Sequence, residues 1–539
     1  MWFVTKIHAN FAHIPSNRGR TKRRLRHHKA VQPLKLKKHI LSLAVVLLAG
    51  LATPSFGDDG DLTLGAERRM GDGIAREILR DPDYIDDPLL DEYVEGIWQS
   101  LLTAARAKGE LSPEMYERFA WRVMMGRDRT VNAFALPGGY FGVHLGLIGI
   151  VNTRDELASV LAHELTHVTQ RHISRSIAKQ GRQTPMLIAG MILGALAASK
   201  SPDAAGALMM GSQAAAMQSQ LNYSREMERE ADRIGFNLMQ PAGFAPQGIV
   251  GMFNLLQQSA RLSDNGSYPY LRSHPLTTER IGDMQSRVQS AFPSSVVPKG
   301  TMEHAMMAAR GRVLSDPGVD ILRLWAAEPQ KSGAAGFAAL PPPRQAAVLY
   351  AAALASVKLR ESERAKAYVN RLKTVVAGDV SASRVANLLA AELALAAGDA
   401  APALLLDTST TGSGRQARPE LFVASSAQIA SKKADLAAQN LRTWVAVHPL
   451  DAPAWQLLAS AYTALDQPLR ATRASAEVQV ALLDYSAAVD RFRSAQELVR
   501  TGSVAAGRDF IEESIVDVRT RQVQELLKEQ RKDEKEAAK

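Results

Sequence analysis

The chain has 539 residues, of which 46% are hydrophobic and 22% are charged, and it contains no cysteine. This length predicts two or three domains, and the hydrophobic fraction excludes a disordered chain. The absence of cysteine excludes disulfides, thiolate metal ligands and cysteine nucleophiles.

The formal net charge of +10 comes from the N-terminus. Eleven of the 65 Lys and Arg lie within residues 1–57, which contain no acidic residue, so the remaining 54 balance the 55 acidic residues. We therefore do not interpret the basic character as nucleic-acid binding, and no nucleic-acid partner is expected.

Residues 1–57 have the features of an export signal. Three lysines within residues 35–38 precede an apolar run over residues 40–51, and residues 55–57 offer small side chains where a signal peptidase reads them. The apolar run is short for a membrane span, although a membrane anchor is the alternative. We expect a signal peptide with an extended basic N-terminus and a location in the bacterial periplasm.

Residues 58–150 are expected to begin with helices and to end in a sheet. Apolar side chains recur at helical spacing between Leu89 and Leu101, which predicts helices over residues 58–120. Over residues 119–150 the apolar runs are broken by Pro-Gly-Gly at 137–139, which predicts extended chain in a small antiparallel sheet.

A His-Glu-x-x-His motif follows the predicted sheet. His163 and His167 are four residues apart, so both imidazoles face one side of a helix and can hold one Zn²⁺. Glu164 lies beside them and can take a proton from a water molecule that attacks a peptide carbonyl. The alternative is a surface helix with two incidental histidines.

The helix that carries this motif has a clear predicted start. Thr153 and Glu156 are spaced as a capping box, and the helix is expected to continue past His172. Because His172 follows His167 by five residues, we expect it to pack or to meet solvent rather than to share the ligand face.

A catalytic zinc site needs a third protein ligand, and residues 224–232 offer candidates. Glu228 and Asp232 are four apart on a predicted helix, so Glu228 could bind the metal while Asp232 holds a ligand histidine in place. The alternative is a solvated acidic helix face, since Glu226 and Glu230 are equally acidic.

Two further segments flank this helix. Residues 186–217 predict two apolar helices, either buried over the catalytic core or in contact with a membrane. The helix at 225–240 is expected to stop at Pro241. Ser-His-Pro-Leu at 273–276 is expected to form a loop before another helix.

The second half of the chain is expected to be an all-α solenoid of tetratricopeptide (TPR) repeats over residues 301–518, with a generic helical bundle as the alternative. Helix-length segments alternate with short breaks, and one segment fits the TPR pattern at Trp455, Leu458, Ala459 and Tyr462. Residues 519–539 are highly charged and are expected to form a solvated helix that frays.

Three motifs together resemble the gluzincin family of the CAAX prenyl endopeptidase and the heat-shock protease HtpX. They are His-Glu-x-x-His at 163–167, Glu-x-Glu-Ala-Asp at 228–232 and Asn-Ala-Phe-Ala-x-Pro-Gly-Gly at 132–139. The exported branch with C-terminal TPR repeats is the most similar. Over residues 65–290 the resemblance rests on these sequence motifs. Over the TPR half it rests only on the expected arrangement of helices. It implies an α+β zincin-like metalloprotease domain, mostly helical with a small sheet, over residues 58–295.

The resemblance implies roles for five residues. One Zn²⁺ per chain is held by His163, His167 and Glu228. Glu164 is the general base, and Asp232 is an accessory catalytic residue, often assigned as a proton donor.

The resemblance implies roles for two further features. In this branch a histidine before Pro-Leu covers the site and can occupy the open metal position, so His274 is a candidate regulatory switch. The strand around Asn132–Phe134 is either a core strand or an edge that an extended substrate joins by β-augmentation.

The sequence thus predicts a periplasmic zinc endopeptidase. By resemblance, it degrades misassembled outer-membrane β-barrel proteins and assists their assembly, and its TPR half binds the assembly machinery, including the lipopolysaccharide transport pore. The alternative is a chaperone or scaffold with a largely latent metal site.

Overall fold

The computed structural model describes residues 62–180, 225–262, 268–292, 300–331, 333–406, 417–501 and 509–537. The predicted signal peptide and the predicted apolar helices over 186–217 lie outside these residues. Within them, no helix is long and apolar enough to cross a membrane.

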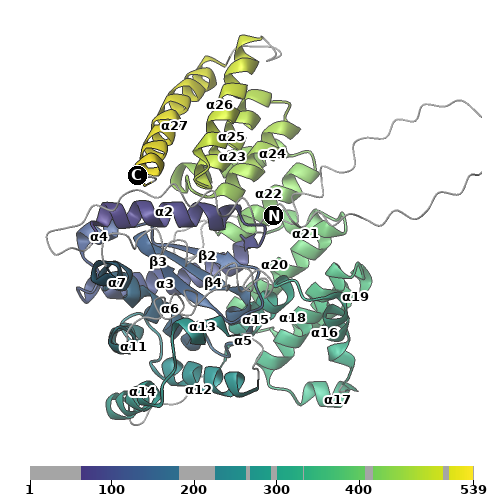
Figure 1. The fold of residues 1–539 in the computed structure, drawn as a ribbon. Coiled ribbons are helices and arrows are strands. Elements are labelled where there is room, and N and C mark those ends of the chain that lie inside the picture. The colour runs from purple at the N-terminus through teal and green to yellow at the C-terminus, as the bar shows by residue number, and fades with distance from the viewer. Residues whose placement is uncertain are drawn as a thin grey trace, which may run out of the picture.

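The first half of the chain folds into helices around one small sheet (Figure 1). Its elements are α2 (Leu64–Arg80), β1 (Tyr84–Ile85), α3 (Pro88–Ala107), α4 (Pro113–Arg118), β2 (Arg122–Gly126), β3 (Ala133–Leu136), the 3-10 turn η3 (Pro137–Gly139), β4 (Tyr140–His144), α5 (Leu145–Ile150), α6 (Arg154–Thr169), α7 (His172–Gln180), α11 (Arg225–Met239), α12 (Gln247–Leu262), α13 (Pro269–Ser273) and α14 (Thr278–Ala291).

The sheet is mixed, so the prediction of an antiparallel sheet is wrong for one of its pairs. The strand order is β1-β2-β4-β3, and β2 pairs with β4 in parallel while the other two pairs are antiparallel. Apolar runs predict strands but carry no information on their direction. The predicted extended segment also ends earlier, because residues 145–150 form the helix α5.

The turn between β3 and β4 needs its glycine. Gly138 has φ 74°, and a Cβ there would lie 2.8 Å from the Arg68 Cα atom. Only glycine avoids both the strained φ and this contact. The tight turn lets α2 pack closely against it and leaves β3 at the edge of the sheet.

Helix α6 lies at the centre of this half of the molecule. It packs against α3, α11, α12 and β3, and almost all its residues are buried. Apolar side chains such as Leu157, Leu161 and Leu165 face these neighbours and are fully buried. The polar motif on α6 is therefore enclosed by the fold rather than exposed on a surface helix.

The second half is all-α, as predicted. Its helices are α15 (Met302–Leu314), α16 (Val319–Lys331), α17 (Gly333–Ala338), α18 (Pro342–Lys358), α19 (Ser362–Val375), α20 (Val380–Ala396), α21 (Ala401–Leu404), α22 (Arg418–Ala430), α23 (Ala434–Val447), α24 (Ala452–Ala464), α25 (Pro468–Ala481), α26 (Tyr485–Arg500) and α27 (Phe510–Ala537).

From α22 onward each helix packs on the next along the chain. The residues of the TPR pattern lie buried on α24 and contribute to an apolar core with α23 and α25. That the helix pairs are TPR repeats stays a prediction, as do the domain boundaries. A single core of buried residues extends from Ile85 to Leu389, across the predicted boundary.

The C-terminal tail is more ordered than the sequence predicted. Residues 519–537 continue α27, which packs against α26 (Figure 1). Val516, Thr520 and Val523 are buried at helical spacing, whereas the charged side chains cover the other faces. A mainly charged composition hides such a narrow apolar stripe.

Candidate metal centre

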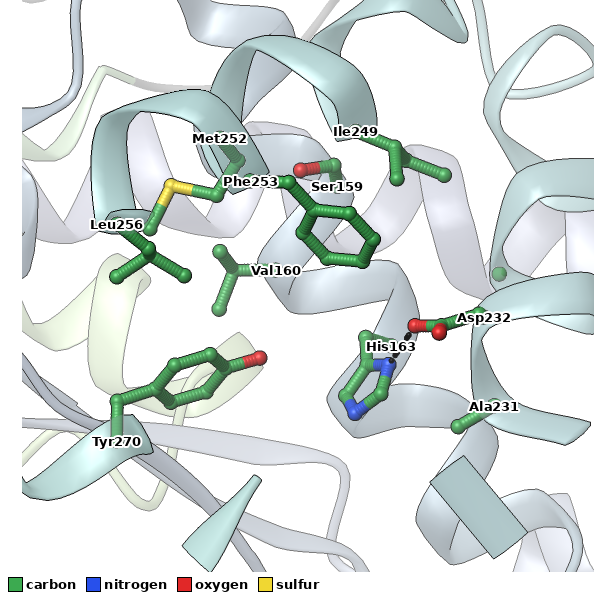
Figure 2. A pocket seen from close by; sticks show the side chains of 11 residues that line it. Ser159, Val160, His163, Ala231, Asp232, Ile249, Met252, Phe253, Leu256 and Tyr270 are labelled. Carbon is green, nitrogen blue, oxygen red and sulfur yellow. Dashed lines mark hydrogen bonds and ion pairs between the residues drawn. The ribbon is translucent and has the colours of Figure 1, made fainter. Parts of the chain in front are cut away.

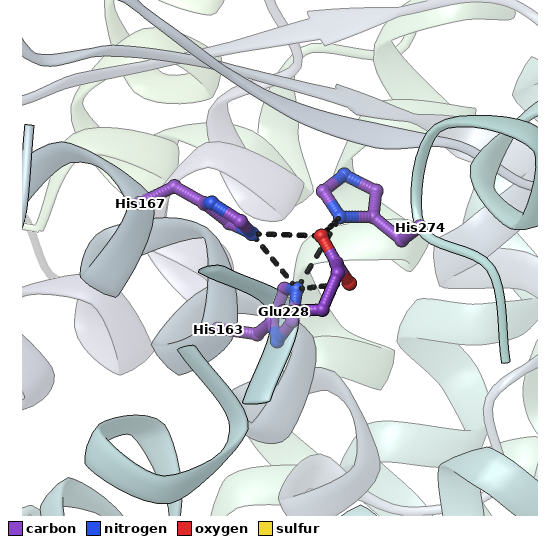
Figure 3. A group of neighbouring side chains, drawn as sticks. All are labelled: His163, His167, Glu228 and His274. Atoms are coloured by element: carbon purple, nitrogen blue, oxygen red, sulfur yellow. Dashed lines mark hydrogen bonds and ion pairs between the residues drawn. The ribbon is translucent and has the colours of Figure 1, made fainter. Parts of the chain in front are cut away.

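His163 and His167 lie on the same face of α6, as predicted. Thr153 starts this helix by accepting a hydrogen bond at Oγ1 from the Glu156 N–H (3.1 Å). The Nε2 atoms of the two histidines are 3.0 Å apart (Figure 3). Both side chains are buried, with 0–7% of their surface exposed.

Helix α11 brings two carboxylates to these imidazoles. The oxygens of Glu228 lie 3.5 Å from Nε2 of His163 and 3.5 Å from Nε2 of His167. Nδ1 of His163 donates to Oδ1 of Asp232 (3.0 Å). Glu228 thus faces the nitrogens that can bind a metal, whereas Asp232 faces the other nitrogen of one ligand.

His274 closes the group from the loop between α13 and α14. Its Nδ1 atom lies 3.0 Å from Oε1 of Glu228 and 3.3 Å from Nε2 of His163 (Figure 3). Its Nε2 atom is 3.5 Å from Oε1 of Glu164. The predicted regulatory residue is therefore in contact with both the predicted ligands and the predicted base.

These residues fit a cation. The ligand atoms of His163, His167, Glu228 and His274 lie within 4.8 Å of one another, and imidazole with carboxylate is a donor set that suits zinc. Both carboxylate oxygens of Glu164 are buried and accept no hydrogen bond from the part of the chain that is described. Such a carboxylate is costly unless positive charge or a donor compensates it.

Electrostatics in this group favour positive charge near the carboxylates. Burial disfavours the imidazolium of His163, but hydrogen bonds and charges from Asp232 and Glu228 outweigh burial and raise its pKa to about 10. Burial, reinforced by the charge of His163, keeps the pKa of His167 well below its usual range. Burial opposes ionisation of Glu228, yet His274 and His163 hold its pKa well below the usual value.

Arg280 on α14 is a site residue that the sequence did not single out. Its Nε and Nη2 atoms donate to Asp232 (2.6 and 2.8 Å). Its Nη1 atom donates to the Pro275 carbonyl (2.9 Å) and lies 2.7 Å from Oε2 of Glu228. Burial raises the pKa of Asp232, but Arg280 and His163 outweigh it and hold this pKa low. Asp232 is therefore an ionised acceptor.

The structure differs from the prediction for the helix around His172. The helix does not continue past it: α6 ends at Thr169, and α7 begins at His172 after Arg171, whose φ is 53°. His172 is fully buried, and its Nδ1 atom is 2.8 Å from Nδ1 of His167. Burial lowers the pKa of His172 to about 4, although Glu230 acts in the opposite direction.

A mostly apolar pocket is lined in part by His163 and Asp232. Side chains from α6, α11, α12 and α13 line it, with Tyr270 across the pocket from His163 (Figure 2). The Tyr270 ring stacks on His274 with centroids 4.7 Å apart. The backbone N–H of Tyr270 donates to the Val131 carbonyl (3.2 Å). These apolar surroundings strengthen the hydrogen bond between His163 and Asp232.

Comparison with known families finds a match for this part of the chain. Residues 88–288 match the model of peptidase family M48, a range that holds the whole ligand group. Residues 88–288 are thus similar to a family of metallopeptidases, which supports the prediction of a metalloprotease.

Individual relatives agree with this match. A Vibrio cholerae protein named as a β-barrel assembly-enhancing protease is 35% identical over 237 residues, which are 44% of this chain and 47% of that protein. The β-barrel assembly-enhancing protease of Escherichia coli is 31% identical over 274 residues (48% and 54%). The mitochondrial metalloendopeptidase OMA1 of Saccharomyces cerevisiae is 26% identical over 203 residues (37% and 56%). The chain matches about half the length of these curated relatives.

Proposed function

We propose, from the premise that residues 88–288 match peptidase family M48, that the chain is a zinc-dependent endopeptidase. In this proposal His163, His167 and Glu228 hold one Zn²⁺ per chain. Two nitrogens and one carboxylate oxygen leave an open position, as a catalytic zinc site requires. When bound, Zn²⁺ supplies a Lewis acid that polarises a peptide carbonyl and lowers the pKa of water.

Glu164 acts as the general base in this proposal. The observation that carries it is the placement of this carboxylate: it is buried beside the ligand group, and both its oxygens are without a hydrogen-bond donor in the described parts of the chain. Its oxygens are therefore available to take a proton from an attacking water molecule and later to return it to the leaving amine.

Asp232 is better suited to positioning than to proton donation. It accepts a forked pair of hydrogen bonds from Arg280 and a further one from His163, and its pKa is held low. An ionised carboxylate with three donors fixes the orientation of the His163 ring and leaves the Nε2 lone pair for the metal. We therefore assign it as a positioning residue in place of the expected proton donor.

His274 holds the site in a latent state in this proposal. It lies between the ligand group and Glu164, in the space where water and a scissile carbonyl would bind. The N–H of Tyr270, one turn before it, is bonded to the Val131 carbonyl near the edge strand β3. A substrate strand that pairs with this edge would compete for that carbonyl and so loosen the loop that carries His274.

The names of the relatives and the predicted signal support a proposal for the substrates and the location. The names of the bacterial relatives state a role in β-barrel assembly. We propose that this chain works in the periplasm, that it degrades misassembled outer-membrane β-barrel proteins and assists their assembly, and that the helical second half binds the assembly machinery as a TPR solenoid.

A second function rests on the size of the helical second half and on the placement of His274. A chain whose metal site is closed for most of the time can serve mainly as a chaperone or scaffold for β-barrel proteins. The two functions differ in one respect: a scaffold supports assembly equally well when Glu164 is replaced by Gln.

Metal analysis of the purified chain beside a casein cleavage assay tests the proposal. We expect about one zinc per chain and cleavage that a chelator abolishes and added zinc restores. Cleavage that continues unchanged in a sample stripped of metal would overturn the zinc mechanism.

A further inference from the structure

A second histidine lies directly behind one of the proposed zinc ligands. Nδ1 of His172 is 2.8 Å from Nδ1 of His167, and the two rings meet edge to face with centroids 4.8 Å apart. On its other side, Nε2 of His172 is 3.0 Å from Oε2 of Glu230, an oxygen that also accepts from Nη1 of Arg175 (3.1 Å).

A break in the helix puts His172 in this place. On a continuous helix, a side chain five residues after His167 would point about 140° away from it. Arg171 adopts φ 53° instead, and its side chain is tied to Glu67, Ser174 and the Leu62 carbonyl. A positive φ at a residue other than glycine persists only when the surroundings enforce it. The fold thus turns the chain so that His172 faces back toward the ligand group.

The hydrogen-bond directions are consistent from end to end. Nε2 of His167 faces His163 and Glu228, so the lone pair used for a metal lies there and the proton of the neutral ring lies on Nδ1. That Nδ1–H then donates to Nδ1 of His172. The proton of His172 must therefore lie on Nε2, from which it donates to Glu230.

We propose that His172, held by Glu230, is a positioning residue that fixes the tautomer and ring orientation of His167 for metal binding. This inference rests on the proposed zinc function. It assigns the two ligand histidines different supports: His163 donates directly to the buried carboxylate of Asp232, whereas His167 reaches the half-buried carboxylate of Glu230 through a neutral imidazole.

Loss of such a support weakens metal binding by roughly 10- to 100-fold. H172L removes the acceptor that His172 offers to the Nδ1–H of His167. In H172N the amide oxygen takes about the position of Nδ1 and keeps an acceptor, although the contact with Glu230 is lost. His172→Leu should therefore lower affinity by about 10- to 100-fold, and His172→Asn by less.

A matched control comes from another buried histidine. His304 lies on α15, where its ring nitrogens contact the Tyr93 hydroxyl (2.7 Å) and the Val151 carbonyl (3.0 Å) rather than a ligand residue. H304L removes an equally buried imidazole, so it reports the general cost of such a change. We expect it to lower thermal stability and to leave zinc affinity unchanged.

The experiment measures zinc affinity of the full chain by competition with a chromogenic chelator, together with thermal unfolding and the visible spectrum of the cobalt(II)-loaded protein. We expect H172L to weaken zinc binding and to shift the cobalt ligand-field bands, with H304L matching wild type in both. A folded H172L with wild-type affinity would overturn the positioning role, as would an equal loss in H304L. If wild type itself does not bind zinc, the proposed function fails instead.

A second pair of variants decides the matter if H172L does not fold. Glu230 is 30% exposed, so E230A is tolerated more readily, and Glu226 on the same helix is an exposed control. We expect E230A to weaken zinc binding relative to E226A because it removes the carboxylate that accepts from Nε2 of His172. Equal affinities in the two variants would overturn the inference.

Discussion

Nδ1 of His274 lies 3.0 Å from Oε1 of Glu228, so the loop histidine is in direct contact with a proposed zinc ligand. The same nitrogen lies 3.3 Å from Nε2 of His163, and His274 belongs to the group of four residues that could hold a metal. This nitrogen can either donate to Glu228 or offer its lone pair to a metal. In the proposed latent state the ring fills the position that a substrate needs.

Replacement of His274 by Ala should raise the basal rate of casein cleavage and leave the zinc content near one per chain. Three ligands are sufficient for a catalytic zinc site, and the change opens the fourth position. Initial rates and metal analysis measure the two effects. S273A is the control beside that loop, because the Ser273 hydroxyl donates to the carbonyls of Pro269 and Tyr270 on α13. A slower H274A that has lost zinc would show that His274 is an essential ligand.

Replacement of Glu164 by Gln should abolish most cleavage and leave the metal in place. Removing a general base costs about 10²- to 10⁴-fold in rate, whereas a neutral amide of the same size disturbs the buried site little. The measurement is kcat with zinc content and thermal stability recorded on the same sample. Cleavage by E164Q at the wild-type rate would disprove the role of this carboxylate.

Much of the site was predictable because its motifs lie on helices. Spacings of four residues place His163 with His167, and Glu228 with Asp232, whatever the rest of the fold does. The sequence could not show Arg280, since its partner Asp232 is 48 residues away. Nor could it show His172, because the helix break at Arg171 depends on side-chain contacts with distant residues.

The fold was predictable to a similar degree. Hydrophobic periodicity located the helices and the turn at residues 137–139, but it could not give the parallel pairing of β2 with β4. Strand direction is decided by how the connections pack rather than by local pattern. The buried stripe of α27 was missed because three apolar or small positions are few among many charged ones.

Replacement of Arg280 by Leu should destabilise the metal-free protein by about 3–5 kcal/mol. The change removes the counter-charge of two buried carboxylates, Asp232 and Glu228, and leaves them uncompensated. Urea unfolding in the presence of a chelator measures the loss. R287L on the same helix is the control, because the ion pair of Arg287 with Asp283 is about 40% exposed and contributes little. Equal stabilities of the two variants would contradict the structural role of Arg280.

His304 should make the protein less stable as the pH falls below about 6.5. Burial lowers its pKa from 6.5, although the Val151 carbonyl and Asp155 act in the opposite direction; Arg154 and Arg312 lower it further. The unfolded state then binds a proton more readily than the folded state, so the stability that neutral His304 contributes is present above pH 6.5 and is lost as the pH falls through the folded-state pKa.

The comparison of wild type with H304Q isolates this effect, because all other titrating groups are shared. The difference in free energy of unfolding between them should shrink between pH 7.5 and pH 5. Urea unfolding at each pH measures it. A difference that stays constant over this range would rule out titration of His304 as its cause.

Replacement of Arg310 by Met should destabilise the protein by about 3–5 kcal/mol, because this arginine joins the two halves of the chain from a buried position. Its Nε and Nη2 atoms donate to Asp87, the N-cap of α3 (both 2.7 Å), and Nη1 donates to Tyr350 and Glu392. Without it, two carboxylates remain buried between α3 and α20.

R323M is the control, since Arg323 and Asp320 form an exposed pair worth about 0–1 kcal/mol. Thermal and urea unfolding measure both variants. The double variant D87L/R310M should recover part of the loss, because it removes one buried charge along with its partner. If R310M unfolds like R323M, the contact between α3 and α15 does not depend on this ion pair.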